Sequence, residues 1–243
     1  MTHVIRYVFA MHVPAFGRSL KLPLTLDDLE QPGFATEVRG ATATPLVSGP
    51  AVERHVAITF DDGPHPEGTP RMLEVLAEFD ARATFFLVGE QVVKRPALAR
   101  QIVSMGHTVG LHGYIHRPHP TRRKRAMIHD FDRGMAAIAD ATGVEPRLHR
   151  PPYGIYSPAT LSIARERGLQ PLLWSKWGKD WRKMATPEQI THRVVDGLQA
   201  GDVILLHDAD YYSARRSYRR TAAALPTIMK TLQSAELGTV AFA

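Results

Sequence analysis

Two adjacent carboxylates, Asp61 and Asp62, stand directly after an apolar run in the stretch AITFDDGPHP. Neighbouring carboxylates repel each other, and each is costly to bury without a partner. Residues 57–60 are apolar or β-branched and Gly63-Pro64 follows, so the pattern predicts a buried strand that runs into a sharp turn. Asp-Gly-Pro is also ordinary turn chemistry, in which the aspartate caps its own backbone. The pair alone is therefore compatible with a structural turn and with an active site.

Two histidines four residues apart, His112 and His116, occur in the stretch VGLHGYIH. In a helix or tight turn this spacing lets both imidazoles face one metal ion. A carboxylate such as Asp62 would complete a set that leaves coordination positions for water and substrate. Asp61 would then stay unligated as a general base that activates the attacking water. A lone H-x-x-x-H is more often a pair of packing histidines, so this interpretation depends on the polar residues elsewhere.

Polar residues follow three further apolar runs: His149-Arg150 and His207-Asp208 stand where their runs end, and the run 171–174 leads into WSKWGKDW, with Asp180-Trp181. Arg150 would supply a fixed positive charge that holds Asp61 ionised and oriented. His207 would be the general acid for the leaving group, with Asp180 setting its protonation. Together these residues indicate metal-assisted hydrolysis of an amide or an ester.

The elements that must position these residues alternate from about Arg54 onward. Short β-like runs lie at 56–60, 83–88, 108–111, 147–149, 171–174, 203–206 and 239–242. Amphipathic helical stretches lie between or after them at 69–80, 95–106, 122–143, 157–168, 186–201 and 217–238, and Pro226 predicts a kink or boundary in the last. This alternation predicts an α/β fold with a parallel sheet, either closed as a barrel or open and doubly wound. The carboxyl ends of its strands share one rim, where active sites assemble.

The length of 243 residues suits one large domain with a short extension. Residues 1–50 lack the strand–helix alternation and predict an N-terminal extension, with a catalytic domain over 51–243. The chain has no cysteine, which excludes disulfides, thiolate nucleophiles and cysteine-ligated metals. No apolar run is long enough to span a membrane.

The net charge of +6 concentrates in two basic runs, 121–125 and 214–220. No zinc-finger, helix-turn-helix or RNA-binding motif accompanies them, so we expect no nucleic-acid partner. The first residues lack the long apolar region and cleavage site of a secretory signal. A cytoplasmic location is therefore the default expectation, and a secreted or cell-envelope location stays open if the true start lies elsewhere.

Five short stretches give the chain a resemblance to a known family. TFDDGP, HGYIH, RPPYG, KDW and ILLHD match, in order, the five motifs of the polysaccharide deacetylases, which are carbohydrate esterase family 4 with the nodulation-factor deacetylase homology domain. The matches run from about Val56 to Asp208. The resemblance implies a distorted (β/α)7 barrel and a divalent metal ion, zinc in the first place, with cobalt or another transition metal as the alternative.

The resemblance also implies a role for each matching residue. Asp62, His112 and His116 resemble the metal ligands, and Asp61 and His207 the catalytic base and acid. Arg150 and Asp180 resemble the partners of that pair. The backbone N–H of Tyr153 would hold the oxyanion, and the side chains of Tyr153, Trp181 and Leu206 would contact the substrate. For Trp181 and Leu206 the alternative is plain core packing. Arg82 is a further candidate partner of Asp61.

The chain departs from the family pattern at two places. Gly113 follows the first metal histidine where the family commonly has Ser or Thr, and residues 177–179 lack an earlier acid of the fourth motif. His119, His129 and His149 lie near the motifs, and the resemblance assigns them no role. These departures affect substrate choice and leave the catalytic set complete.

The leading hypothesis is thus a metal-dependent hydrolase that removes N-acetyl groups from amino sugars of a glycan, oligosaccharide or glycoconjugate. The alternative hypothesis has the same fold and metal, but its substrate is a small non-glycan amide or ester. A non-catalytic carbohydrate-binding module would have lost a catalytic residue, and here all are present. The oligomeric state stays open.

Overall fold

The computed structural model describes residues 54–242, so the predicted extension at 1–50 and its boundary lie outside the described residues. The centre of the fold is a parallel sheet whose carboxyl ends carry the motif residues. Its strands are β1 (His55–Asp61), β2 (Ala83–Leu87), β3 (Thr108–Leu111), β4 (Leu148–His149), β5 (Gln170–Pro171), β6 (Lys176–Trp177), β7 (Val203–His207) and β8 (Gly238–Thr239).

The strand order along the sheet is β5-β4-β3-β2-β1-β7-β6, and β8 pairs with β1 off this path. Every pair is parallel. Apart from β8, this is the cyclic order of a seven-stranded barrel. In the described part of the chain no pairing closes it between β5 and β6. The sheet is therefore a curled, open form of the predicted (β/α)7 barrel.

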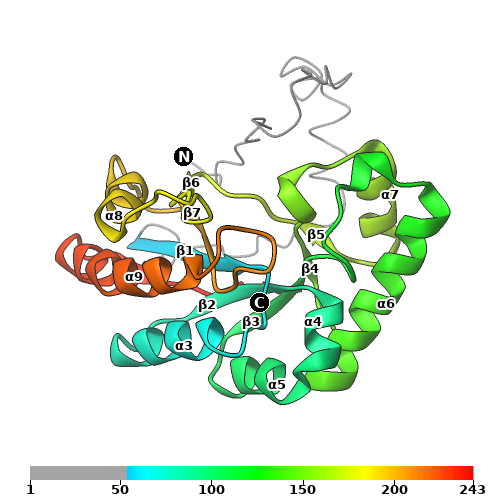
Figure 1. Ribbon diagram of the computed structural model, residues 1–243, viewed down its shortest axis with the longest axis horizontal. Coiled ribbons are helices and arrows are strands. Elements are labelled where there is room, and N and C mark those ends of the chain that lie inside the picture. The colour runs from blue at the N-terminus through cyan, green and yellow to red at the C-terminus, as the bar shows by residue number, and fades with distance from the viewer. Residues whose placement is uncertain (1–53, 243) are drawn as a thin grey trace.

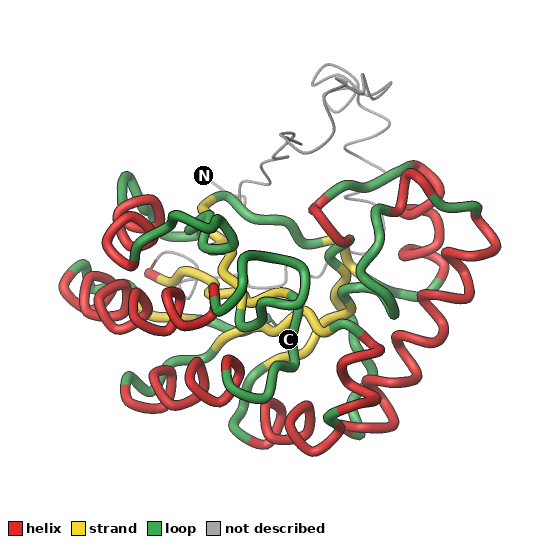
Figure 2. Tube along the Cα trace, in the orientation of Figure 1, coloured by secondary structure: helices red, strands yellow, loops and turns green. Residues whose placement is uncertain are grey.

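Helices cover the outside of this curled sheet (Figure 1). They are α3 (Gly68–Glu78), α4 (Gly89–Lys94), α5 (Pro96–Ser104), α6 (Lys124–Thr142), α7 (Pro158–Glu166), α8 (Pro187–Val195) and α9 (Ser217–Ser234). Helices α3, α8 and α9 lie on one side of the strands and α6 and α7 on the other, and Figure 2 shows the strands enclosed between them. One continuous set of buried side chains, including Phe60 from β1 and Leu225 from α9, joins sheet and helices.

Local sequence signals explain where several helices begin and end. Ser157 caps α7 by accepting a hydrogen bond from the N–H of Thr160, and Thr186 with Gln189 forms a capping box at α8. Helix α6 ends at Gly143, whose φ of 74° is the left-handed conformation that glycine adopts at low cost. These ends agree with the predicted stretches to within a few residues.

The structure differs from the sequence prediction at four elements. Helix α4 and strand β6 were not predicted because each is too short to show a periodic pattern. Of the run 171–174 only the first residue lies in β5, and Leu172, Leu173 and Trp174 are buried as core residues instead. Helix α9 continues through Pro226, so this proline is not a helix boundary.

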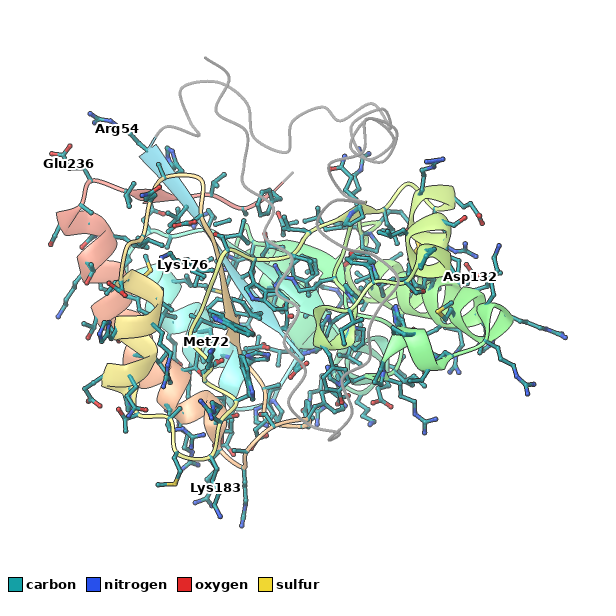
Figure 3. All side chains as sticks on the ribbon, turned by 90° about the horizontal axis from the view of Figure 1, so that it is seen from above. Arg54, Met72, Asp132, Lys176, Lys183 and Glu236 are labelled. Carbon is teal, nitrogen blue, oxygen red and sulfur yellow. The ribbon has the colours of Figure 1, made fainter. Side chains whose placement is uncertain are left out.

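The residue before β1 and the loop after β6 lie at opposite ends of the molecule. Arg54, which precedes β1, lies beside Glu236 at one end of the molecule, and Lys183, two residues after Trp181, lies at the opposite end (Figure 3).

Within residues 54–242, no helix combines the length and the apolar character needed to cross a membrane.

Candidate active site

The two carboxylates at the end of β1 point to different partners. Asp61 Oδ1 lies 2.7 Å from Arg150 Nη1, whereas Asp62 Oδ1 lies 3.2 Å from His116 Nε2. Asp62 adopts a φ of 82°, a left-handed conformation that is uncommon for a residue with a side chain and marks functional sites. This turn separates the two carboxylates, although both are 3% exposed.

Asp62, His112 and His116 form a group that could hold a metal ion. One ligand atom from each lies within 4.8 Å of the others, and Asp62 Oδ1 is 3.5 Å from His112 Nε2. Tetrahedral zinc with bonds of about 2.0–2.1 Å needs ligand atoms about 3.3 Å apart. Asp62 Oδ1 is also buried without a hydrogen-bond partner among the described residues. The donor types, their spacing and this orphaned oxygen fit a divalent cation.

The histidines keep Asp62 ionised. Burial by itself would raise the pKa of Asp62, but the nearby His116 and His112 hold that pKa below its usual range. His112 is oriented by its other ring nitrogen, since Nδ1 lies 2.8 Å from the carbonyl oxygen of Arg150. A histidine ligand is commonly fixed by such a second hydrogen bond.

Arg150 is fully buried and orients Asp61. Its guanidinium donates to Asp61, to Thr59 Oγ1 at 2.8 Å, and to the carbonyl oxygens of Leu172 and Leu173 at 2.9 and 3.0 Å. Arginine suits this place because its planar head carries several donors in fixed directions. Asp61 Oδ2 lies 3.8 Å from His112 Nε2, so the carboxylate that Arg150 holds borders the candidate metal site.

His207, which is partly exposed, and the fully buried Asp180 form a second pair, next to Asp61 on the neighbouring strand β7. His207 Nδ1 lies 2.9 Å from Asp180 Oδ1, and the backbone N–H of His207 donates to Asp180 Oδ2 at 2.8 Å. Thr221 Oγ1 donates to the same Oδ2 at 2.7 Å. Burial would lower the pKa of His207, but the carboxylates of Asp180, Asp62 and Asp61 raise it to about 10. His207 is therefore protonated at neutral pH.

Comparison with known proteins identifies the family. The family model for polysaccharide deacetylases matches residues 48–172, and the chain is 37% identical to a peptidoglycan-N-acetylglucosamine deacetylase of Bacillus cereus over 186 residues, 76% of this chain and 84% of that relative. The chain belongs to the polysaccharide deacetylase family. It is a hydrolase, a deacetylase of glycan amino sugars of the carbohydrate esterase 4 type.

Two further relatives support this assignment. A chitooligosaccharide deacetylase of Azorhizobium caulinodans is 32% identical over 186 residues, covering 74% of this chain and 88% of the relative. The family 4 carbohydrate esterase from Streptomyces lividans, solved in complex with acetate, superposes with a TM-score of 0.69 at 33% identity. That comparison covers 76% of this chain and 91% of the esterase. The similarity therefore extends over sequence and fold together.

The predicted substrate contacts of the deacetylase lie around this centre. Tyr153 is 54% exposed and adopts a φ of 63°, and its ring lies 4.7 Å from the ring of His116. The Trp181 ring meets His207 edge-on at 5.4 Å. Leu206 is fully buried in the core directly before His207. The roles of these three side chains toward substrate stay predictions.

The prediction for Arg82 was wrong. Arg82 precedes Ala83, the first residue of β2, and Ala83 pairs with Ile58 in the middle of β1, whereas Asp61 pairs with Phe86 near the carboxyl end of β2. Its Nη1 lies 3.5 Å from Asp80 instead, and its side chain is about half exposed. In a parallel sheet only residues at the carboxyl ends of strands meet at the catalytic rim.

The family departure at Gly113 has a structural reason. Gly113 has a φ of 81°, and a Cβ there would lie 3.0 Å from Asp130 Oδ2. Asp130 accepts hydrogen bonds from the backbone N–H groups of Tyr114 and Ile115 at 2.8 and 3.3 Å. A carboxylate from α6 thus supports the loop from beneath, where a family member would have a hydroxyl beside the histidine.

The unassigned histidines fall into two environments. His119 and His149 are fully buried with rings stacked at 5.6 Å, and burial lowers the pKa of both, that of His119 to about 3. His129 is exposed. The buried pair lies beneath the metal-site loop and is neutral at physiological pH.

Three contributors to the site were not predicted from the sequence. Thr59 and Thr221 hold Arg150 and Asp180, and nothing in their local pattern distinguishes them from packing residues. Tyr212 stacks on His116, with ring centroids 4.1 Å apart and planes 7° apart. Its place five residues after His207, at the rim of the sheet, is the signal that could have found it.

Proposed function

We propose that this deacetylase removes the acetyl group from N-acetylglucosamine residues of a glycan, with a divalent metal ion, zinc in the first place, held by Asp62, His112 and His116. The separation of Asp61 from Asp62 carries the proposal, because Asp62 faces the two histidines and can bind the metal, while Asp61 faces Arg150 and stays free to accept a proton. The named relatives from Bacillus and Azorhizobium support the N-acetylglucosamine unit as substrate. When bound, the cation supplies Lewis-acid polarisation of the acetyl carbonyl and of water.

Asp61 acts as the general base. Arg150 fixes Oδ1 of this carboxylate, which leaves Oδ2 turned toward the candidate metal site to accept a proton from the attacking water. The water oxygen bonds to the acetyl carbon, and the carbonyl becomes a tetrahedral oxyanion. The backbone N–H of Tyr153 donates to that oxyanion.

His207 acts as the general acid. With a pKa raised to about 10 it carries the proton that the leaving nitrogen needs when the C–N bond breaks. Asp180 accepts from Nδ1, so the proton that His207 gives up is the one on Nε2. The products are acetate and a free amine on the sugar.

Acetate release from a short N-acetylchito-oligosaccharide tests this proposal. Metal-stripped protein is assayed with and without added zinc or cobalt, and Asp61→Asn is the matched blank because it keeps the metal ligands and changes only the base. We expect metal-dependent release from the wild type, with a loss of at least a hundredfold in the variant. In a zinc titration we expect the wild type and Asp61→Asn each to bind one ion.

Two outcomes would overturn parts of the proposal. Release by metal-free protein would remove the metal from the chemistry. One bound zinc without release would move the substrate to a small non-glycan amide or ester, and a panel of aryl acetamides and acetate esters would then identify it.

A further inference from the structure

His116 lies in the loop after β3 and lacks the second hydrogen bond that fixes His112. Its side chain is 6% exposed, and its Nδ1 is buried with no hydrogen-bond partner within residues 54–242. His112, in contrast, has the Arg150 carbonyl oxygen 2.8 Å from its Nδ1. Because a ligating imidazole must present one nitrogen in one direction, something else has to orient the ring of His116.

Aromatic packing takes that role. The ring of Tyr212 lies parallel to the imidazole of His116, 4.1 Å away and within 7° of its plane. Tyr153 meets the same imidazole at 4.7 Å and 60°. Rotation of the imidazole about its Cβ–Cγ bond would tilt it out of the parallel contact and toward one of the two tyrosines, so the packing restricts the ring to one plane.

Tyr212 is itself held in place by α4. Its hydroxyl donates to Glu90 Oε1 at 2.8 Å and accepts from Gln91 Nε2 at 3.2 Å. Burial, and then Glu90, raise the pKa of the Tyr212 hydroxyl above its ordinary value. The ring that stacks on His116 is thereby tied to a helix and not to its own loop alone.

The same helix also holds the backbone of the histidine loop. The N–H of Gly89 donates to the carbonyl oxygen of Gly113 at 2.9 Å, and the N–H of Glu90 donates to that of Tyr114 at 2.9 Å. Gly89 allows this approach, because a Cβ there would lie 2.7 Å from the Tyr114 ring. The first turn of α4 therefore fixes the His116 loop and, through Tyr212, the ring plane.

We propose that Tyr212 is a positioning residue for the metal ligand His116. Its ring orients the imidazole of His116 in place of a second hydrogen bond. Helix α4 holds both the Tyr212 hydroxyl and the backbone of the His116 loop, so the ring and the loop keep a fixed relative position. The proposal rests on the proposed function, because it takes His116 to be a metal ligand. Tyr212 touches a ligand and does not itself touch the metal or the reacting atoms.

Zinc affinity and the absorption spectrum of the cobalt-loaded protein test this role. Tyr212→Ala removes the stacked ring, and we expect its zinc Kd to rise about 10–100-fold, in the range found for other groups that orient metal ligands. The d–d bands of bound cobalt should shift or broaden, because the imidazole no longer has one orientation. Tyr212→Phe keeps the ring and should bind zinc within about threefold of the wild type. Unchanged zinc affinity and an unchanged cobalt spectrum in Tyr212→Ala would overturn the proposal.

Three controls separate this inference from its premises. Tyr211→Ala removes the neighbouring tyrosine, which packs on His65 and edge-on against Tyr212 but not on a ligand, and should weaken zinc binding much less than Tyr212→Ala does. Tyr212→Leu fills the space without a flat face, so it replaces Tyr212→Ala if the latter fails to fold, with the same expectation. His116→Ala tests the premise: if it binds zinc like the wild type, the metal site itself is wrong, and the role of Tyr212 falls with it.

Discussion

Asp61 and His207 are register partners on the neighbouring parallel strands β1 and β7. Adjacent strands lie about 4.8 Å apart, so the ladder places the proposed base and the proposed acid side by side at the rim. Arg150 then fixes the first through a buried hydrogen bond, and Asp180 fixes the second through a partly buried one. Because the sheet itself sets the spacing of the two groups, neither depends on a mobile loop for its place.

Asp180→Asn should shift the alkaline limb of the pH–activity profile to lower pH. The acid works only while His207 is protonated, so activity is lost as pH rises through its pKa of about 10. Without the Asp180 charge that pKa falls toward the ordinary value by about one to three pH units, since Asp62 and Asp61 still raise it. The profile of kcat/KM between pH 6 and 10.5 measures it. Thr221→Val removes one hydrogen bond to Asp180 and keeps the charge, so its limb should move much less. An unmoved limb in Asp180→Asn would contradict the role of the pair.

Arg150→Lys should destabilise the fold and impair catalysis together. A lysine ammonium cannot reach Asp61, Thr59 and the two carbonyl oxygens that the guanidinium holds at once. The loss leaves buried acceptors unpaired beside a carboxylate, which costs on the order of 3–5 kcal/mol of unfolding free energy. Urea denaturation measures this loss. Thr59→Val removes one acceptor of Arg150 and the hydrogen bond to the Ile204 carbonyl oxygen, and should cost about 1.5–3 kcal/mol. Equal losses in the two variants would mean that the guanidinium donors other than the one to Thr59 contribute nothing to stability.

His119→Phe should make the protein less sensitive to acid. The pKa of His119 is about 3 in the folded protein and near 6.5 in the unfolded chain, so its stabilising effect is complete above pH 6.5 and is lost as pH falls toward 3. At pH 4.5 the loss is roughly 2–3 kcal/mol. We expect the difference in unfolding free energy between pH 7 and pH 4.5 to shrink by that amount in the variant.

The exposed His129 offers the control, because His129→Gln should keep the wild-type slope. Asp208, whose pKa burial raises to about 7, changes stability with pH in the opposite direction. It does so in all three proteins, so the comparison isolates His119. If the unfolding free energy changes with pH by the same amount in His119→Phe and His129→Gln, His119 becomes protonated within the folded protein.

Gly63→Ala should disturb the metal site through Asp208. A Cβ at this position would lie 2.6 Å from Asp208 Oδ1, and Asp208 is fully buried, with Thr69 Oγ1 donating to its other oxygen. We expect Gly63→Ala to lose on the order of 2 kcal/mol of stability and to bind zinc more weakly, because Gly63 directly follows Asp62. In the background Asp208→Ala the same change should cost less, with a coupling of about 1 kcal/mol or more. Strict additivity in the double-mutant cycle would rule out this contact as the cause.

The sequence determined which residues form the site and at which end of the sheet they lie. The strand–helix alternation and the polar residues after each apolar run come from local burial, which leaves a periodic trace in the chain. Parallel pairing then requires the carboxyl ends of the strands to share a rim. The sequence alone therefore predicts that Asp61, His112, Arg150 and His207 lie close together. The same rule excludes Arg82, which stands at the start of its strand.

Only the tertiary structure decided which partner each of these side chains meets. The left-handed turn at Asp62 separates two carboxylates that are equivalent in sequence, and the register of β1 with β7 sets Asp61 beside His207. The stack of Tyr212 on His116 joins residues 96 positions apart, and β6 forms only because β7 is there to pair with it. Such contacts depend on side-chain direction and on packing between distant segments, and neither leaves a periodic pattern in the chain.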